Sequence, residues 1–413
     1  MAGLRGLAAL AAALRKGERV FMGGSTAEVV PLTTALGSGD VPALDLTSSL
    51  VPGMNPLPAQ LPAGMRLTNP FSVTTDAPVR HLALSYGGYC SWLSRQDFDT
   101  CIVHVAPPRR GRMASLGTAA EFTPVAMRRA RRIIAVVNEA IPDLPDAAHL
   151  DLTQADLVIE LHSPLRESVS GRPNAQAEAI AGHIAGFVGD GAAVQVGLGK
   201  VPDALFARLG DRRGLRIQSG MVSDSIRPLA EGGALDPAWT HMTCVQVGTA
   251  EHYRWLRGRA GFAVLGCEVT HDPAVLAKAR GLIAVNSAIE VDLFGQANLE
   301  VAGGRVVSSV GGAADFARAA MLDPAGLSII GLPASLPGAS RIVARLGGPV
   351  SLPRHDVEVV VTEHGTADLR GQDAEGRAER LIAIAAPEHR AALAAAWEGM
   401  ARKGAIPAAV RPG

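Results

Sequence analysis

Short apolar runs alternate along the chain with stretches rich in Ala, Leu and Arg. Runs with the length and β-branched content of buried strands lie at 19–22, 100–105, 133–138, 157–161 and 193–196. Stretches with helical spacing lie at 27–37, 123–132 and 175–189. This rhythm predicts an α/β fold with mainly parallel sheets, whose ligand sites lie in the loops at the carboxyl ends of the strands.

The first fifteen residues have the spacing of an amphipathic helix. Leu4, Leu7, Leu10 and Leu14 fall on one helical face, and charged residues follow at once, without the small-residue cleavage pattern of a signal peptide. No stretch of about 18 uncharged apolar residues exists, so no membrane span is predicted. We therefore expect a cytoplasmic protein.

A polar segment at 161–173, which contains two prolines, separates the two halves of the chain. It predicts a domain boundary that divides the chain into residues 1–172 and 173–413. Each half has a strand that runs into a Gly-rich turn and then a helix, at 19–24 in the first half and at 193–200 in the second. The two halves are therefore expected to share a fold.

Composition excludes several classes of protein. Of the 413 residues, 48% are apolar and 19% are charged, which excludes a mainly disordered chain. Lys plus Arg and Asp plus Glu balance at 39 each, which argues against a nucleic-acid binder but leaves room for a small anionic ligand. The four cysteines form no CxxC pair and no HExxH occurs, so we predict no metal and a reducing compartment.

Two glycine loops are candidate sites for an anion or a developing oxyanion. Glycine lets backbone N–H groups approach a ligand closely, and a following helix adds the positive end of its dipole. An ordinary strand-to-helix turn is the alternative interpretation of both loops. Their residues are Val196, Gly197, Leu198, Gly199 and Lys200 in the first loop, and Gly311 and Gly312 in the second.

Two polar stretches are candidate sites of acid–base chemistry. In the block that begins with Asn286, alternation predicts a strand on which Glu290 and Asp292 share one face, about 7 Å apart. Paired carboxylates suit acid–base work, and a structural hydrogen-bonding face is the alternative. His364 follows Glu363 directly, so it is a candidate base or a member of a loop-fixing network.

Taken in order, these blocks resemble the acetyl-CoA hydrolase/transferase family, which includes acetate, succinate and 4-hydroxybutyrate CoA-transferases. The resemblance covers nearly the whole chain, from about residue 20 to residue 394. The matching stretches are 20–24, 106–117, 194–205, 221–224, 285–298, 310–316, 340–346, 355–371 and 377–387.

The resemblance implies two similar CoA-transferase-like α/β domains, an active site at their junction and a homodimer. It also implies ping-pong chemistry, in which a glutamate carboxylate carries CoA as a thioester. Coenzyme A or an acyl-CoA is then the substrate. The implied CoA contacts are Val196, Gly197, Leu198, Gly199, Lys200, Asn286, Gly311, Gly312 and Arg341. Arg341 is included because the Ser-Thr-Ala-Lys stretch of many family members is replaced here by residues 333–340, which contain no lysine.

The chain departs from the family pattern at the nucleophile. The family glutamate precedes a Met-x-Ser-Asp run, and here Met221, Ser223 and Asp224 fix that register, which puts Gly220 at the glutamate position. Glycine has no nucleophile. A glutamyl-CoA intermediate at this position is therefore chemically impossible.

Three functions follow as hypotheses. The first is an enzyme that acts on an acyl-CoA or acyl-pantetheine thioester by hydrolysis, acyl transfer or cyclisation, with Glu290, Ser219 or His364 as base. The second is a CoA-transferase that uses a displaced carboxylate such as Glu290. The third is a non-catalytic CoA-ester-binding subunit or sensor. In each, the partner is a small acyl thioester, or one carried by an acyl carrier protein.

Overall fold

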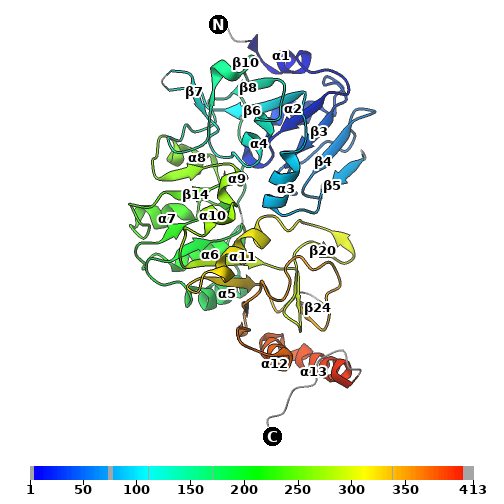
Figure 1. Ribbon diagram of the computed structural model, residues 1–413, viewed down its shortest axis with the longest axis vertical. Coiled ribbons are helices and arrows are strands. Elements are labelled where there is room, and N and C mark those ends of the chain that lie inside the picture. The colour runs from blue at the N-terminus through cyan, green and yellow to red at the C-terminus, as the bar shows by residue number, and fades with distance from the viewer. Residues whose placement is uncertain (1–3, 73–77, 110, 170, 337, 403–413) are drawn as a thin grey trace. The chain divides into compact units, whose positions relative to one another are not determined.

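A computed structural model of the chain describes residues 4–72, 78–109, 111–169, 171–336 and 338–402 (Figure 1). The chain forms two compact α/β units with mainly parallel sheets, which confirms the predicted fold class. Unit 1 comprises Met1–Val169, Ile217–Arg227 and Pro237–Leu276, and unit 2 comprises Ser170–Arg216, Pro228–Asp236 and Ala277–Gly413. The expected division after residue 172 lies close to the first crossing between the units. The later return of the chain to unit 1 was not expected.

Unit 1 is built on an eight-stranded sheet in which every neighbouring pair of strands is parallel. Its central strands are buried along almost their whole length, as the apolar runs predicted. In spatial order the strands are β1 (Leu4–Arg5), β10 (Leu157–Glu160), β8 (Ile133–Val137), β6 (Thr100–Val105), β2 (Arg19–Met22), β3 (Asp45–Ser48), β4 (Arg66–Asn69) and β5 (Val79–His81).

Short helices and small sheets complete unit 1. Its helices include α1 (Leu7–Ala12), α2 (Val30–Ala35), α3 (Tyr86–Leu93), α4 (Thr123–Met127), α8 (Ala250–Leu256), α9 (Cys267–Thr270) and α10 (Pro273–Leu276). Its two-stranded sheets pair β7 (Met113–Ser115) with β9 (His149–Asp151), β13 (Met221–Val222) with β15 (Val245–Gln246), and β14 (His241–Thr243) with β16 (Phe262–Val264).

Unit 2 contains a six-stranded sheet whose central strands are parallel. In order the strands are β12 (Arg216–Ile217), β11 (Ala193–Gln195), β17 (Leu282–Ser287), β22 (Leu327–Gly331), β26 (Val359–Thr362) and β27 (Gly365–Asp368). The main helices are α5 (Ala175–Ala185), α6 (Lys200–Arg208), α11 (Ala313–Leu322), α12 (Ala374–Ile384) and α13 (Pro387–Arg402). Helix α11 packs on β17 and β22, and α12 packs on β27 and α13.

All three stretches predicted as helical are shorter than expected, and the stretch 175–189 is helical only to Ala185. The stretch 27–37 begins with a 3-10 turn at Ser25–Ala27, and α2 starts only at Val30. Pro31 lies in its first turn, where the missing N–H costs no hydrogen bond. The stretch 123–132 is helical only to Met127. Of the first four leucines, Leu4 lies in β1, whereas Leu10 and Leu14 are buried in the core of unit 1.

Among the described residues, no helix combines the length and the apolar character that a membrane crossing requires.

The turn after β2 depends on a glycine. A Cβ atom on Gly24 would lie 2.0 Å from the backbone oxygen of Ser49, in the loop that follows β3. Because a backbone atom cannot move aside as a flexible side chain can, only glycine fits this position. The close approach also lets the Gly24 N–H donate to Ser49 Oγ at 2.9 Å.

We therefore predict that Gly24→Ala lowers the free energy of unfolding by about 2 kcal/mol or more, through overpacking against Ser49. Urea denaturation measures this change. Gly210→Ala is the matched control, because Gly210 is exposed and its Cβ would meet nothing within 4 Å. The control should change stability by less than about 0.5 kcal/mol. Equal stability of the two variants would show that the Gly24 contact is not as tight as described.

Candidate active site

Gly220 lies in unit 1, between β12 and β13, and is buried. Its carbonyl oxygen accepts hydrogen bonds from the N–H groups of Cys244 (2.8 Å) and Val245 (3.1 Å), and from the Cys244 thiol (3.1 Å). The neighbouring Ser219 is also buried, and its hydroxyl donates to the carbonyl oxygen of Met221 at 3.1 Å. The backbone at the expected nucleophile position is therefore held firmly, mostly by Cys244.

Asp224 anchors the end of this motif. Its Oδ2 accepts hydrogen bonds from the N–H and the hydroxyl of Thr249, both at 3.3 Å, where α8 begins. Thr249 in turn caps α8 by accepting from the His252 N–H. A Cβ on Gly248 would lie 3.0 Å from the Asp224 carboxylate, so the small residue allows this approach. The Met-x-Ser-Asp run therefore fixes the start of a helix.

A carboxylate that the sequence analysis missed, Glu121, lies beside this backbone. The Cys244 carbonyl accepts from the N–H groups of Ala120 (3.1 Å) and Glu121 (3.4 Å), while the Cys244 amide and thiol bind Gly220. One residue, Cys244, is thus hydrogen-bonded both to the backbone of Glu121 and to the carbonyl of Gly220.

The Glu121 side chain is almost completely buried. Its Oε2 accepts from the Ser49 hydroxyl at 2.7 Å, and Ser49 accepts in turn from the Gly24 N–H. Burial raises the pKa of Glu121 to about 7, although the Ser49 and Ser25 hydroxyls and the Gly24 amide oppose the shift. The second oxygen, Oε1, has no hydrogen-bond partner among the described residues. The carboxyl group therefore keeps one oxygen for a ligand or a water.

The backbone is strained on both sides of this carboxyl group. Ser25 (φ 43°) and Glu121 (φ 38°) are the two non-glycine residues with positive φ in the part of the chain that the structure describes. Such conformations cost about 1–3 kcal/mol each and persist where the surroundings impose them, often at functional sites. Both strained residues lie at one site, since Gly24, which precedes Ser25, binds the Ser49 hydroxyl that donates to the Glu121 carboxylate.

Aromatic side chains enclose the same region. The Phe122 ring lies 5.0 Å from Tyr86 and 4.7 Å from Tyr89, edge to face in both pairs. The Tyr89 hydroxyl donates to the Ser48 carbonyl at 2.9 Å, and Tyr89 is fully buried. These rings keep bulk water from Glu121 and lower the local dielectric.

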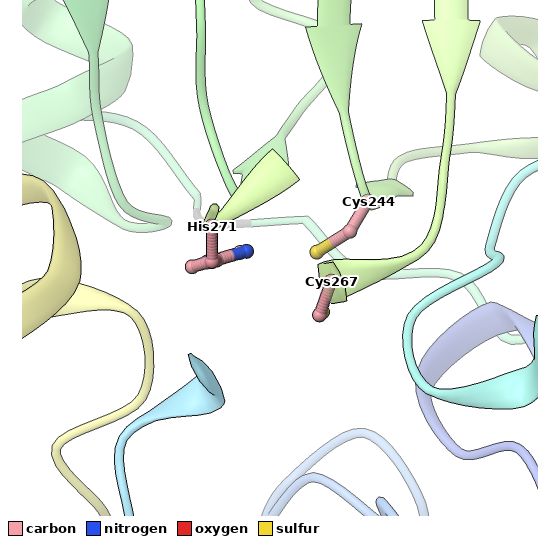
Figure 2. A group of neighbouring side chains, drawn as sticks. All are labelled: Cys244, Cys267 and His271. Atoms are coloured by element: carbon pink, nitrogen blue, oxygen red, sulfur yellow. The ribbon is translucent and has the colours of Figure 1, made fainter. Parts of the chain in front are cut away.

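A cluster of two thiols and an imidazole lies next to Glu121, whose carbonyl accepts from the Cys267 N–H at 2.6 Å. The ligand atoms of Cys244, Cys267 and His271 all lie within 4.8 Å of one another (Figure 2). Burial lowers the pKa of His271 to about 3 and raises that of Cys267 well above its usual range. This set of donors could hold a metal ion.

The predicted glycine loops lie in unit 2. Val196 is buried after β11, and Gly199 (φ 125°) caps α6, which begins with the exposed Lys200. Asn286, near the end of the neighbouring strand β17, exchanges side-chain amide hydrogen bonds of 3.3 Å with Gln195. The first loop and Asn286 therefore lie close together at the carboxyl ends of the parallel strands β11 and β17.

The remaining predicted residues of unit 2 have local roles. Gly311 (φ 57°) and Gly312 form the turn that starts α11. Arg341 donates to the Ile289 carbonyl at 3.1 Å. His364 is exposed, 3.9 Å from Glu363.

Glu290 lies in β18 (Glu290–Asp292), and its Oε1 accepts from Asn298 Nδ2 (3.0 Å) and from the Gly347 N–H (2.6 Å). Asp292, two residues on, accepts from the N–H groups of Phe294 and Gln296 in the following turn. Both carboxylates are thus engaged in local structure. This geometry favours the structural interpretation of that polar face over a role as acid–base pair.

One sequence signal for Glu121 was available. Between Arg112 and Arg128 it is the single charged residue in a run of small and apolar side chains. A lone carboxylate in such a run indicates either a buried ion pair or a functional group.

Comparisons with known proteins place the chain among CoA enzymes. Residues 248–397 match the model of the acetyl-CoA hydrolase/transferase C-terminal domain. The chain is 31% identical over 310 residues to the 4-hydroxybutyrate coenzyme A transferase of Clostridium kluyveri, which covers 72% of each chain.

Two solved structures share the fold. The crystal structure of RipA from Yersinia pestis matches with a TM-score of 0.86 and 25% identity, over 96% of this chain and 98% of that one. The 4-hydroxybutyrate CoA-transferase of Porphyromonas gingivalis matches with a TM-score of 0.78 and 23% identity, over 97% and 98% of the two chains.

The buried His252 gives the site region a measurable pH dependence. Burial lowers its pKa to about 4, and its Nε2 lies 3.3 Å from Gln246 Oε1. The unfolded chain takes up a proton near pH 6.5, whereas the native chain does so only near pH 4, so acid favours unfolding between these values. Because of this group, the free energy of unfolding should fall by roughly 2 kcal/mol as the pH is lowered from 7 to 5.

We predict that His252→Phe, which keeps a ring against Trp255, removes this part of the decrease in the free energy of unfolding between pH 7 and pH 5. Urea unfolding at pH 7 and pH 5 measures the difference. The exposed His162, replaced by Asn, is the control and should retain the full loss. An unchanged pH dependence in His252→Phe would mean that the imidazole already titrates normally in the native state.

Proposed function

Since the chain belongs to the acetyl-CoA hydrolase/transferase family, we propose that it hydrolyses an acyl-CoA thioester, with Glu121 in place of the carboxylate that is missing at Gly220. The single observation that supports this most strongly is the position of Glu121. It is a buried, strained carboxylate linked to Gly220 through Cys244.

Burial of Glu121 favours water over a thioester as its direct reaction partner. With about 1% of its surface exposed, the side chain cannot meet a bulky acyl-CoA without a rearrangement, whereas Oε1, which has no protein partner among the described residues, can accept a hydrogen bond from a water molecule. In the proposed step the carboxylate removes a proton from water as the oxygen attacks the thioester carbonyl. The C–S bond then breaks, CoA leaves as a thiolate that takes up a proton, and a carboxylic acid is released.

The glycine loops of unit 2 are proposed as the CoA contacts. The loop at Val196–Lys200 offers backbone N–H groups and a cation, and Gly311, Gly312, Asn286 and Arg341 are the further candidates. The acyl group, a carrier-bound pantetheine in place of CoA, the homodimer and the cytoplasmic location stay predictions. The catalytic roles of Ser219, His364 and Glu290 also stay predictions.

Two alternatives predict different outcomes in the same assay. A CoA-transferase with a displaced carboxylate would carry CoA covalently, so intact mass spectrometry after incubation with an acyl-CoA would show an adduct. A non-catalytic binder would retain the acyl-CoA without releasing thiol.

We predict that Glu121→Gln lowers the rate of CoA release by about 100-fold or more, because the amide cannot accept the proton. The assay follows free thiol with acetyl-, succinyl- and longer acyl-CoAs, with and without acetate. Glu300→Gln is the matched control, since Glu300 is also buried and accepts a serine hydroxyl, that of Ser351, at 2.6 Å. The control should retain turnover. Full activity in Glu121→Gln together with loss of activity in Glu290→Gln would overturn the proposal in favour of the displaced nucleophile.

Replacement of Gly220 tests whether this residue stands at the position of the family glutamate. We predict that Gly220→Glu forms a covalent CoA adduct with an acyl-CoA, because it restores the carboxylate at the family position. Intact mass spectrometry detects the adduct, which the wild-type protein should lack. A folded variant that binds acyl-CoA but never gains the mass of CoA would contradict the assigned register.

A further inference from the structure

We propose that Cys244, Cys267 and His271 form a binding site for a thiophilic divalent metal ion, Zn²⁺ in the first place. The family resemblance does not call for it, and the sequence analysis predicted no metal because the chain lacks CxxC and HExxH. The inference does not rest on the proposed hydrolysis. It follows from side chains that the fold brings together from separate segments.

Two of the ligands come from one helical turn. Cys267 is the first residue of α9 and His271 is the residue that caps it, so the two lie four positions apart on one face of the helix. Cys244 comes from the link between β14 and β15. All three side chains are buried, and their ligand atoms lie within 4.8 Å of one another. Figure 2 shows the imidazole of His271 turned toward the sulfur of Cys244.

The donor set matches the preference of zinc. Thiolate sulfur and imidazole nitrogen bind Zn²⁺ at about 2.3 Å and about 2.0 Å, in tetrahedral sites whose ligand atoms lie roughly 3.5–4 Å apart. The observed separations, within 4.8 Å, therefore need a contraction of about 1.3 Å at most. Binding replaces the two thiol protons, which pass to solvent as the Zn–S bonds form.

One ring nitrogen of His271 is already engaged in a hydrogen bond, as is usual for histidines that bind a metal through the other nitrogen. Its Nδ1 lies 2.8 Å from the Thr270 hydroxyl, so we assign Nε2 as the metal ligand. The Tyr86 ring packs against it with centroids 5.0 Å apart. These contacts fix the ring plane, which favours coordination because little side-chain freedom is lost on binding.

A third thiol and a cavity complete the site. Cys90, in α3, lines the same cavity as Cys267. A cavity of about 300 Å³ is lined by Cys90, Cys267 and His271 among others. It offers an entry path, and a water can supply the fourth ligand of a tetrahedral ion.

Metal binding would act on the neighbouring backbone. The Cys244 thiol now donates to the Gly220 carbonyl, and as a metal-bound thiolate it could no longer do so. The Cys267 N–H contacts the Glu121 carbonyl at 2.6 Å, so the ion would also brace the segment that carries this carboxylate.

Cobalt titration of the full-length protein tests the site. The protein is kept under a phosphine reductant, stripped with a chelator, dialysed and titrated with Co²⁺. We expect a thiolate-to-cobalt charge-transfer band with tetrahedral d–d bands that saturate at one equivalent and disappear when Zn²⁺ is added. The absence of any charge-transfer band in the folded wild-type protein would overturn the proposal, whatever the enzymatic activity.

Two ligand variants and one control test the assignment of the ligands. Cys267→Ser should weaken Co²⁺ binding by about 100-fold or more, and His271→Asn should weaken it while the remaining thiolates keep a residual charge-transfer band. Cys101→Ser is the matched control, because Cys101 is a fully buried thiol in β6, outside the cluster. It should bind as the wild type does. Circular dichroism of the metal-free variants separates lost ligands from lost folding, and an unweakened band in both ligand variants would show binding elsewhere.

Discussion

Burial of the Glu121 carboxyl group is the constraint around which unit 1 is organised. A carboxylate enclosed by tyrosine and phenylalanine rings is costly unless polar groups compensate it, and here one hydroxyl, that of Ser49, does so directly. The Ser49 hydroxyl is itself held by the Gly24 amide, which reaches it only because residue 24 has no Cβ. The positive φ angles of Ser25 and Glu121 add strain that the rest of the unit must sustain. The fold of unit 1 thus sustains the cost of burying one acidic group away from water.

The strands were predictable because their signal is local. The strands β2 and β6 have the bounds that the apolar runs gave, and β8 and β10 are each one residue shorter than their runs. In a parallel sheet covered on both faces nearly every side chain is buried, so the run itself marks the strand. The prediction of a helix over 123–132 was too long, since α4 ends at Met127. Helix propensity is a weak signal that tertiary context overrides.

The site was only partly predictable. The flanking residues of Gly220 and the composition of the first glycine loop led to predictions whose roles stay predictions, whereas Glu121 has no neighbouring motif that defines its chemistry. Its proposed role depends on three segments that meet through Cys244, Ser49 and Gly24, and such a meeting leaves no periodic pattern. The thiol and imidazole cluster was missed for the same reason, since Cys244 and Cys267 are far apart in sequence.

The path of the chain between the two units has a consequence for how such a protein can be divided or recombined. The chain changes unit after residues 169, 216, 227, 236 and 276, so neither unit is one continuous stretch of sequence. A single cut or a gene fusion near residue 172 would leave the amino-terminal fragment without the segments that carry Gly220, Cys244 and His271. The two halves of this gene are therefore not interchangeable modules, and shuffling that respects the fold would have to exchange several inserts at once.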